Sequence, residues 1–263
     1  MADHSDEMIA IGQCRIRLMR GGRGAPLVFL HGGGGIGIWL PCMARLAKKF
    51  DVIVPEHPGF GASDTPDWLD NIGDLANFYL DFLEQLDLRQ IHLVGSSLGG
   101  WIAAELAVRN ATRLASLALV GAAGIHINGV EQVDTFLSSE ERRIRDLFYN
   151  QELAEAVLAG TERPDVEDTV LKNRMITAKL SWQPRGYDPN LRKWLHRIKV
   201  PTLLIWGAQD RLLPQDYAFA YQQLIPGSKA VVLPECGHLP HVEKGEEFAA
   251  ELERFVDAMK VAA

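Results

Sequence analysis

The sequence contains few cysteines: Cys14, Cys42 and Cys236 are the three among 263 residues, and no pair of them has CxxC spacing. An odd and scattered set of thiols is typical neither of a disulfide framework nor of a zinc site, so we expect no disulfide and no metal. Because disulfides persist in oxidising compartments, their expected absence favours the reducing cytoplasm as the location of this chain.

Long apolar runs and an excess of basic residues are also absent. No stretch of about 18 apolar residues occurs, which predicts that no segment spans a membrane. Residues 1–7 are acidic and polar where a signal peptide is basic and then apolar. Asp and Glu total 34 against 27 for Lys and Arg, and the formal net charge of −7 argues against a nucleic-acid partner, whose phosphates need a basic surface.

The composition, with 47% hydrophobic and 23% charged residues, is that of a globular protein and excludes a disordered or fibrous chain. Short apolar runs predict strands that are buried on both faces, as in a parallel sheet, at 26–30, 52–55, 91–94, 117–120, 202–206 and 229–233, with an edge strand or hairpin arm at 9–18. Amphipathic or alanine-rich stretches predict helices at 74–86, 98–108, 215–224 and 246–259. This alternation predicts the α/β class.

Residues 125–196 interrupt the alternation. They contain no strand-like run, are rich in charge and carry several helical patterns separated by glycine and proline. We therefore predict one discontinuous core domain, residues 1–124 and 197–263, with a helical cap at 125–196 between two strands of its sheet.

The segment Gly95 to Gly99 matches the pattern G-x-S-x-G. It follows a predicted strand and opens a predicted helix, which is the context of a nucleophile elbow that exposes the hydroxyl of Ser97 at the carboxyl end of the sheet. The alternative interpretation is a glycine-rich turn whose serine only caps the helix. Short motifs match by chance, so the partners of Ser97 decide between the two.

A serine nucleophile needs a base that a third group orients. Asp210 follows the strand at 202–206, whereas the loop after 117–120 offers no acid. His238 follows the strand at 229–233; His241 lies nearby, and we assign it to the surface or the pocket wall. The order Ser97, Asp210, His238 is that of the α/β hydrolases, and we predict these three as catalytic residues.

The four glycines that follow His31 predict an oxyanion hole. Backbone N–H groups of Gly33 or Gly34, together with that of Leu98, can stabilise an oxyanion. A rival interpretation is a dinucleotide fingerprint, since residues 32–37 also fit G-x-G-x-x-G and Glu56 lies about 20 residues further on. That interpretation leaves the serine, aspartate and histidine unexplained.

Five segments together resemble the α/β-hydrolase superfamily: residues 31–34, 58–63, 95–100, 206–210 and 236–238. The resemblance covers about residues 9–124 and 200–261. It implies the α/β-hydrolase fold, with an eight-stranded, mostly parallel sheet flanked by helices, a helical cap and no cofactor. Glu56 stands where the family usually has Asp, which we interpret as a variation in turn geometry.

Within the superfamily, the chain is similar to carboxylesterases and to the carbon–carbon bond hydrolases of meta-cleavage products. The latter carry a lid arginine, for which Arg174 is the better candidate and Arg185 the weaker. They commonly have Asn and Trp where this chain has Ser96 and Leu239. Further candidates for the substrate pocket are apolar residues of the cap, which could equally be core: Leu147, Phe148, Met175, Leu180 and Trp182.

We therefore predict a serine hydrolase that cleaves small to medium carboxylic esters through an acyl-enzyme. One alternative is a hydrolase that cleaves a carbon–carbon bond of meta-cleavage products, which are vinylogous 1,5-diketones. An alternative of another class is a non-catalytic ligand-binding protein on the same fold. The expected partner is a small-molecule substrate, and the sequence leaves a homodimer open.

Overall fold

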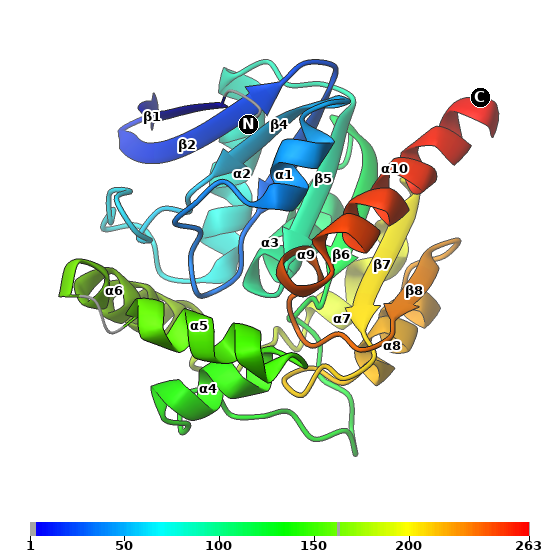
Figure 1. Cartoon of the computed structure of the whole chain (residues 1–263). Helices are drawn as coiled ribbons and strands as arrows, with labels where there is room; N and C mark the ends of the chain where they lie inside the picture. Colours follow the sequence, from blue (N-terminus) through cyan, green and yellow to red (C-terminus); the bar gives the residue numbers. More distant parts are fainter. Residues whose placement is uncertain (1–3, 162–163, 263) are drawn as a thin grey trace.

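The computed structural model describes residues 4–161 and 164–262, so the first three residues of the acidic start lie outside the described residues (Figure 1). Within these ranges, eight strands form one sheet in the order β1-β2-β4-β3-β5-β6-β7-β8. The strands are β1 His4–Ile11, β2 Cys14–Gly22, β3 Ala25–Leu30, β4 Phe50–Pro55, β5 Ile91–Ser96, β6 Leu114–Val120, β7 Thr202–Gly207 and β8 Lys229–Leu233.

The sheet is mostly parallel, as predicted. Strand β2 pairs antiparallel with β1 and β4, and the other neighbours pair parallel. The prediction of a single strand or arm at 9–18 is wrong in its extent, because this range spans a hairpin. Ile11 pairs with Cys14 around a two-residue turn, in which Gly12 has φ of 55°. A tight turn of this kind favours glycine, which adopts positive φ without a steric penalty.

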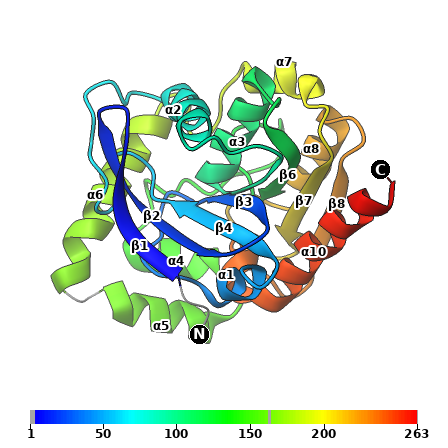
Figure 2. The ribbon, with the colours of Figure 1, turned by 90° about the horizontal axis from the view of Figure 1, so that it is seen from above.

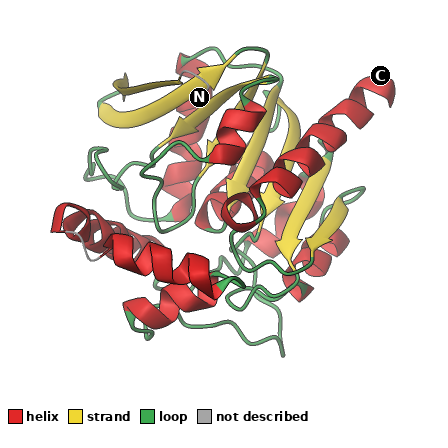
Figure 3. Ribbon diagram, viewed as in Figure 1, coloured by secondary structure: helices red, strands yellow, loops and turns green. Residues whose placement is uncertain are grey.

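Helices cover both faces of the sheet (Figures 2 and 3). On one face, α2 (Ile72–Gln85), α3 (Leu98–Arg109) and α8 (Asp216–Leu224) bury their apolar sides in the larger hydrophobic cluster. On the other face, α1 (Pro41–Leu46) and α10 (Gly245–Ala262) pack in a second cluster. Helix α2 begins at a capping box, in which the side chains of Asn71 and Asp74 satisfy each other's backbone N–H groups.

Between β6 and β7 the chain forms α4 (Glu140–Leu147), α5 (Gln151–Thr161) and α6 (Pro164–Ser181), followed by α7 (Leu191–Trp194) and the 3₁₀ turn η1 (Leu195–Arg197). Helices α4, α5 and α6 lie across the carboxyl end of the parallel strands (Figure 1). Two short helices were not predicted: α1 and α9 (Pro240–Glu243), each of which begins with a proline and is too short for a periodic pattern. Among the described residues, no helix combines the length and apolar character needed to cross a bilayer.

Candidate active site

Ser97 lies at a strained turn between β5 and α3. Its φ of 53° and ψ of −114° are unusual for a residue with a side chain. Small neighbours make the turn possible, because a Cβ at Gly95 would lie 2.3 Å from the carbonyl oxygen of Gly99. A Cβ at Gly99 would lie 2.1 Å from that of Leu30. The close packing holds the serine at the carboxyl end of the central strands, as in a nucleophile elbow.

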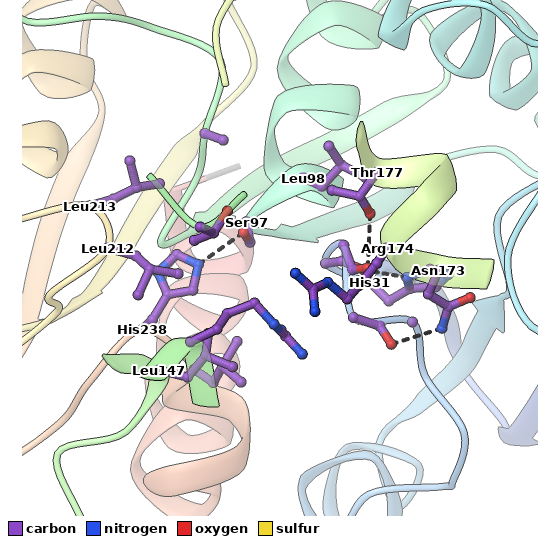
Figure 4. Close-up of a pocket in the computed structure, with 18 of the residues that line it drawn as sticks. His31, Ser97, Leu98, Leu147, Asn173, Arg174, Thr177, Leu212, Leu213 and His238 are labelled. Carbon is purple, nitrogen blue, oxygen red and sulfur yellow. Dashed lines mark hydrogen bonds between the residues drawn. The ribbon is translucent and has the colours of Figure 1, made fainter. Parts of the chain in front are cut away.

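Two loops bring a histidine and an aspartate to this serine. His238 Nε2 lies 2.9 Å from Ser97 Oγ (Figure 4). On the other side of the ring, His238 Nδ1 lies 2.8 Å from Asp210 Oδ2. The other carboxylate oxygen of Asp210 accepts the backbone N–H groups of Leu212 and Leu213, each at 2.9 Å. These bonds fix the carboxylate, and Asp210 in turn favours the histidine tautomer that has its proton on Nδ1 and a free lone pair toward the serine.

The glycine loop crosses next to the serine. A Cβ at Gly32 would lie 3.2 Å from Ser97 Cβ, and Gly33, Gly34 and Leu98 line the same cavity as Ser97. No acceptor in the described part of the chain takes the backbone N–H groups of Gly33, Gly34 or Leu98. The structure thus brings together all six residues that the sequence predicts for the nucleophile, its two partners and the oxyanion donors.

Two buried histidines support the base of the loop. His31 Nδ1 donates to Gly32 O at 2.7 Å, and its Nε2 accepts the N–H of His57 at 3.0 Å. His57 donates from Nε2 to His31 O at 2.8 Å and accepts from the Tyr79 hydroxyl. Burial lowers the pKa of His31 to about 4 and that of His57 well below its usual value. Both rings are therefore neutral structural groups at pH 7.

The dinucleotide interpretation fails at Glu56. Its side chain is buried, and Oε2 accepts the N–H groups of Ala62 at 2.7 Å and Ser63 at 3.1 Å. A Cβ at Gly61 would lie 1.9 Å from its other oxygen. Glu56 therefore holds its own turn and cannot reach a ribose, which agrees with the expected variation in turn geometry.

Ser97 and His238 open into a cavity of about 690 Å³ between the core loops and the helices α4 to α6 (Figure 4). The lining is mostly apolar and includes Leu147, Phe148 and Leu239. Arg174 of α6 reaches into the cavity from the side opposite His238, and its guanidinium lies 3.1 Å from Glu140 Oε2. Such a space accommodates a small, largely apolar molecule with one polar or anionic end.

Some predicted pocket residues lie elsewhere. Trp182 is 50% exposed, is not among the described residues that line the cavity, and stacks over Arg185 with 4.2 Å from its ring centroid to Arg185 Cζ. Met175 points to solvent and Leu180 belongs to the larger core cluster. Ser96 is buried beneath the site, and its hydroxyl has no partner among the described residues. For Met175 and Leu180 of α6, the sequence does not show which face of the helix is turned toward the cavity.

The cavity is also lined by residues that the sequence does not single out, among them Asn173, Thr177 and Arg143. Asn173 and Thr177 are four residues apart and so lie on one face of α6, a spacing visible in the sequence. Nothing in that spacing shows which core loop the face would contact. Across the described residues, no cluster of three or more His, Cys, Asp or Glu side chains is arranged to hold a metal ion.

Residues 25–245 match the family described as alpha/beta hydrolase fold. The chain is 30% identical to 2-hydroxymuconate semialdehyde hydrolase of Pseudomonas sp. (strain CF600), over 98% of this chain and 95% of that protein. A solved membrane phospholipase A, described as a bacterial virulence factor, is similar with a TM-score of 0.81 and 25% identity, over 98% of this chain and 87% of that one. The 2-hydroxy-6-oxo-6-phenylhexa-2,4-dienoate hydrolase from Rhodococcus sp. strain RHA1 shares the fold with a TM-score of 0.79 and 21% identity, over 98% and 100%. The predicted superfamily and fold are thereby confirmed: the chain belongs to the alpha/beta hydrolase fold family.

Proposed function

We propose that this α/β hydrolase is a serine hydrolase of small to medium carboxylic esters. The observation that carries the proposal is the continuous chain of hydrogen bonds from Ser97 through His238 to Asp210, at the wall of an apolar cavity. A serine hydroxyl alone is a weak nucleophile, and this arrangement supplies both a base and the group that orients the base.

The first half of the reaction forms an acyl-enzyme. Ser97 Oγ attacks the ester carbonyl while His238 Nε2 takes its proton, and the negative charge that develops on the carbonyl oxygen is stabilised by backbone N–H groups of the glycine loop and of Leu98. His238 then gives the proton to the departing alkoxide. Asp210 stabilises the imidazolium without becoming protonated itself.

The second half releases the acid. His238 Nε2 takes a proton from a water molecule, whose oxygen attacks the acyl carbon, and the bond to Ser97 Oγ breaks as the proton returns to that oxygen. The cap helices α4 to α6, together with the loops of the discontinuous core, would limit the acyl group by the volume and apolar lining of the cavity. We retain the cap at 125–196 and the cytoplasmic location as parts of this proposal.

A second candidate is carbon–carbon bond cleavage of a vinylogous 1,5-diketone that bears a carboxylate. The charges in the cap favour it, because Glu140 pairs with both Arg143 and Arg174, which leaves one positive charge in excess beside the cavity. Arg185 is neutralised by Asp134. The similarity to 2-hydroxymuconate semialdehyde hydrolase supports the same candidate. Ser96 and Leu239 depart from the residues common in those enzymes and weigh toward esters.

A substrate panel with a Ser97→Ala control tests both candidates. The purified chain is assayed with p-nitrophenyl esters of two to ten carbons and with a 2-hydroxy-6-oxodienoate, and it is labelled with a fluorophosphonate. We expect ester turnover and labelling that both disappear in Ser97→Ala while the fold persists. Faster cleavage of the dienoate favours the second candidate. Labelling that survives the substitution overturns the assignment of Ser97, and ligand retained unchanged by the wild type indicates a binding protein.

A further inference from the structure

The glycine loop is intrinsically flexible, whereas an oxyanion hole needs fixed N–H donors. Gly32 to Gly35 are four consecutive glycines, and glycine has the largest conformational freedom of all residues. An oxyanion hole works only if its N–H donors are already fixed before charge develops, because donors that must reorient during the reaction lose most of their benefit. Something outside the loop must therefore fix the peptide groups of these residues.

The carbonyl oxygens of the loop are anchored from two sides. Gly32 O accepts from the His31 ring at 2.7 Å and from Gly35 N at 3.0 Å, both within the core. The next two oxygens are held by α6, since Thr177 Oγ1 donates to Gly33 O and Asn173 Nδ2 donates to Gly34 O, each at 2.9 Å (Figure 4).

The contact between α6 and the glycine loop leaves no space for side chains at Gly33 and Gly35. A Cβ at Gly33 would lie 2.9 Å from both Oγ1 and Cγ2 of Thr177, and a Cβ at Gly35 would lie 2.4 Å from Asn173 Nδ2. Asn173 is buried, and its Oδ1 accepts the N–H of Gly61 at 2.9 Å, which fixes the orientation of the amide. Both side chains are thus held in place while they hold the glycine backbone.

We propose that Thr177 and Asn173 are positioning residues for the oxyanion hole, so that a helix of the cap sets the geometry of the catalytic core. The carbonyl of one residue and the N–H of the next share a planar peptide group and point in opposite directions. Fixing Gly33 O through Thr177 therefore fixes the N–H of Gly34, and Asn173 on Gly34 O holds the peptide group on the other side of Gly34. The N–H of Gly33 shares its peptide group with Gly32 O, which His31 and Gly35 hold. This inference rests on the proposed serine hydrolase function.

The test compares three variants of α6 by steady-state kinetics on the best ester. Thr177→Val removes the hydroxyl at nearly constant shape, and we expect kcat to fall about tenfold with KM changed less than about twofold, because the lost interaction acts in the transition state. Thr177→Ser keeps the hydroxyl and should restore most of kcat. Lys172→Met is the matched control, because Lys172 joins α6 to Gly61 O and Ser63 O without touching the glycine loop, so kcat should stay at the wild-type value.

A second measurement, the affinity of an inhibitor that forms an oxyanion, tests the oxyanion hole directly. Ser97 Oγ adds to the carbonyl carbon of a trifluoromethyl ketone while His238 takes the hydroxyl proton, and the former carbonyl oxygen becomes an oxyanion. The affinity of this inhibitor should fall about tenfold in Thr177→Val, in parallel with kcat, while the affinity of the product acid stays constant. Equal kcat in Thr177→Val and wild type overturns the inference, as does an equal loss of kcat in Lys172→Met. Wild-type turnover that Ser97→Ala does not abolish overturns the proposed function instead, so the two failures are distinguishable.

Discussion

The sheet and the helices α4 to α6 are held in place by different forces. Strands β5 and β7 are buried along their whole length, and each face of the sheet has its own apolar cluster. Helices α4 and α5 share only a small cluster of three buried residues. Helix α6 combines apolar contacts of Ile176 and Leu180 in the larger cluster with hydrogen bonds from Lys172, Asn173 and Thr177. The proposed catalytic residues thus lie on an extensively buried frame, the sheet and the loops at its carboxyl end, whereas the helices over the cavity are attached by smaller apolar contacts and several individual hydrogen bonds.

The largest effect is expected in the frame. Asp210→Asn keeps the shape of the side chain but lets the amide favour the wrong histidine tautomer, so we expect kcat to fall by about three to four orders of magnitude. Thermal unfolding should remain cooperative. An effect of less than about tenfold would show that Asp210 does not orient His238 and that the comparison places the chemistry on the wrong residues.

Acid should weaken the frame more than the cap helices, because the described residues of 125–196 include no buried histidine. Burial lowers the pKa of His31 to about 4 and that of His241 to about 3. In the unfolded chain these groups titrate near about 6.5, so the unfolded state binds more protons as pH falls below that value. The stabilisation is present above pH 6.5 and is lost toward pH 4, by up to about 1.4 kcal/mol per pH unit for each histidine.

The substitution His241→Phe measures how much of this pH-dependent stability comes from His241. His241 packs against Phe29 and Phe248, and its Nδ1 has no partner within the described residues, so an aromatic replacement fits the site. The free energy of unfolding from urea titrations should depend less steeply on pH between 6.5 and 4, by about 1.4 kcal/mol per unit. An unchanged slope would mean that folding does not lower the pKa of His241.

A smaller and more selective effect is expected in the cap. Arg174→Gln should raise KM for a carboxylate-bearing dienoate about tenfold, because a charge-assisted hydrogen bond contributes roughly 1.5–3 kcal/mol, and leave KM for a neutral ester unchanged. Arg185→Gln is the control, since Asp134 neutralises Arg185. Equal changes for both substrates would show that Arg174 acts on the cap structure alone.

The smallest effects are expected in the free energy of unfolding, when a polar contact between α6 and the core is removed and compared with the loss of an exposed ion pair. Lys172→Met removes two bonds between α6 and the core and should lower the free energy of unfolding by about 1–2 kcal/mol. Arg254→Ala removes an exposed pair with Glu251 on α10 and should change it by less than about 0.5 kcal/mol. Calorimetry on both variants measures the difference; similar values would contradict a special role for polar contacts in holding the cap helices.

The sequence alone predicted the frame well because buried parallel strands leave apolar runs that end at functional loops. Ser97, Asp210 and His238 each follow such a run, and parallel strands bring their carboxyl ends to one edge of the sheet. The hairpin at residues 4–22 was harder, because its turn interrupts no apolar pattern, and the short helices α1 and α9 lack a full period.

The cap was predicted only as a helical interruption. Amphipathic spacing gives the faces of a helix but not which face meets which loop, so the sequence favours Trp182 as a pocket residue and does not distinguish Thr177. Hydrophobicity is also a poor guide to burial here. Met175 is 64% exposed and Trp182 is 50% exposed, while polar Asn173 is buried against the core. Where hydrogen bonds decide the arrangement, composition carries little information about it.

The end of α4 adjoins the histidine loop backbone to backbone. Leu147 O accepts the N–H of His238 at 2.8 Å, a Cβ at Gly237 would lie 2.5 Å from the same oxygen, and Glu243 accepts from both Gly237 N and Asn150 N. An engineered exchange of the helices α4 to α6 that includes residues 147–150 would therefore disturb His238, the proposed general base, along with the pocket. Grafts that begin after residue 150 and preserve Asn173 and Thr177 offer a way to change the substrate range while His238 and the glycine loop keep their positions.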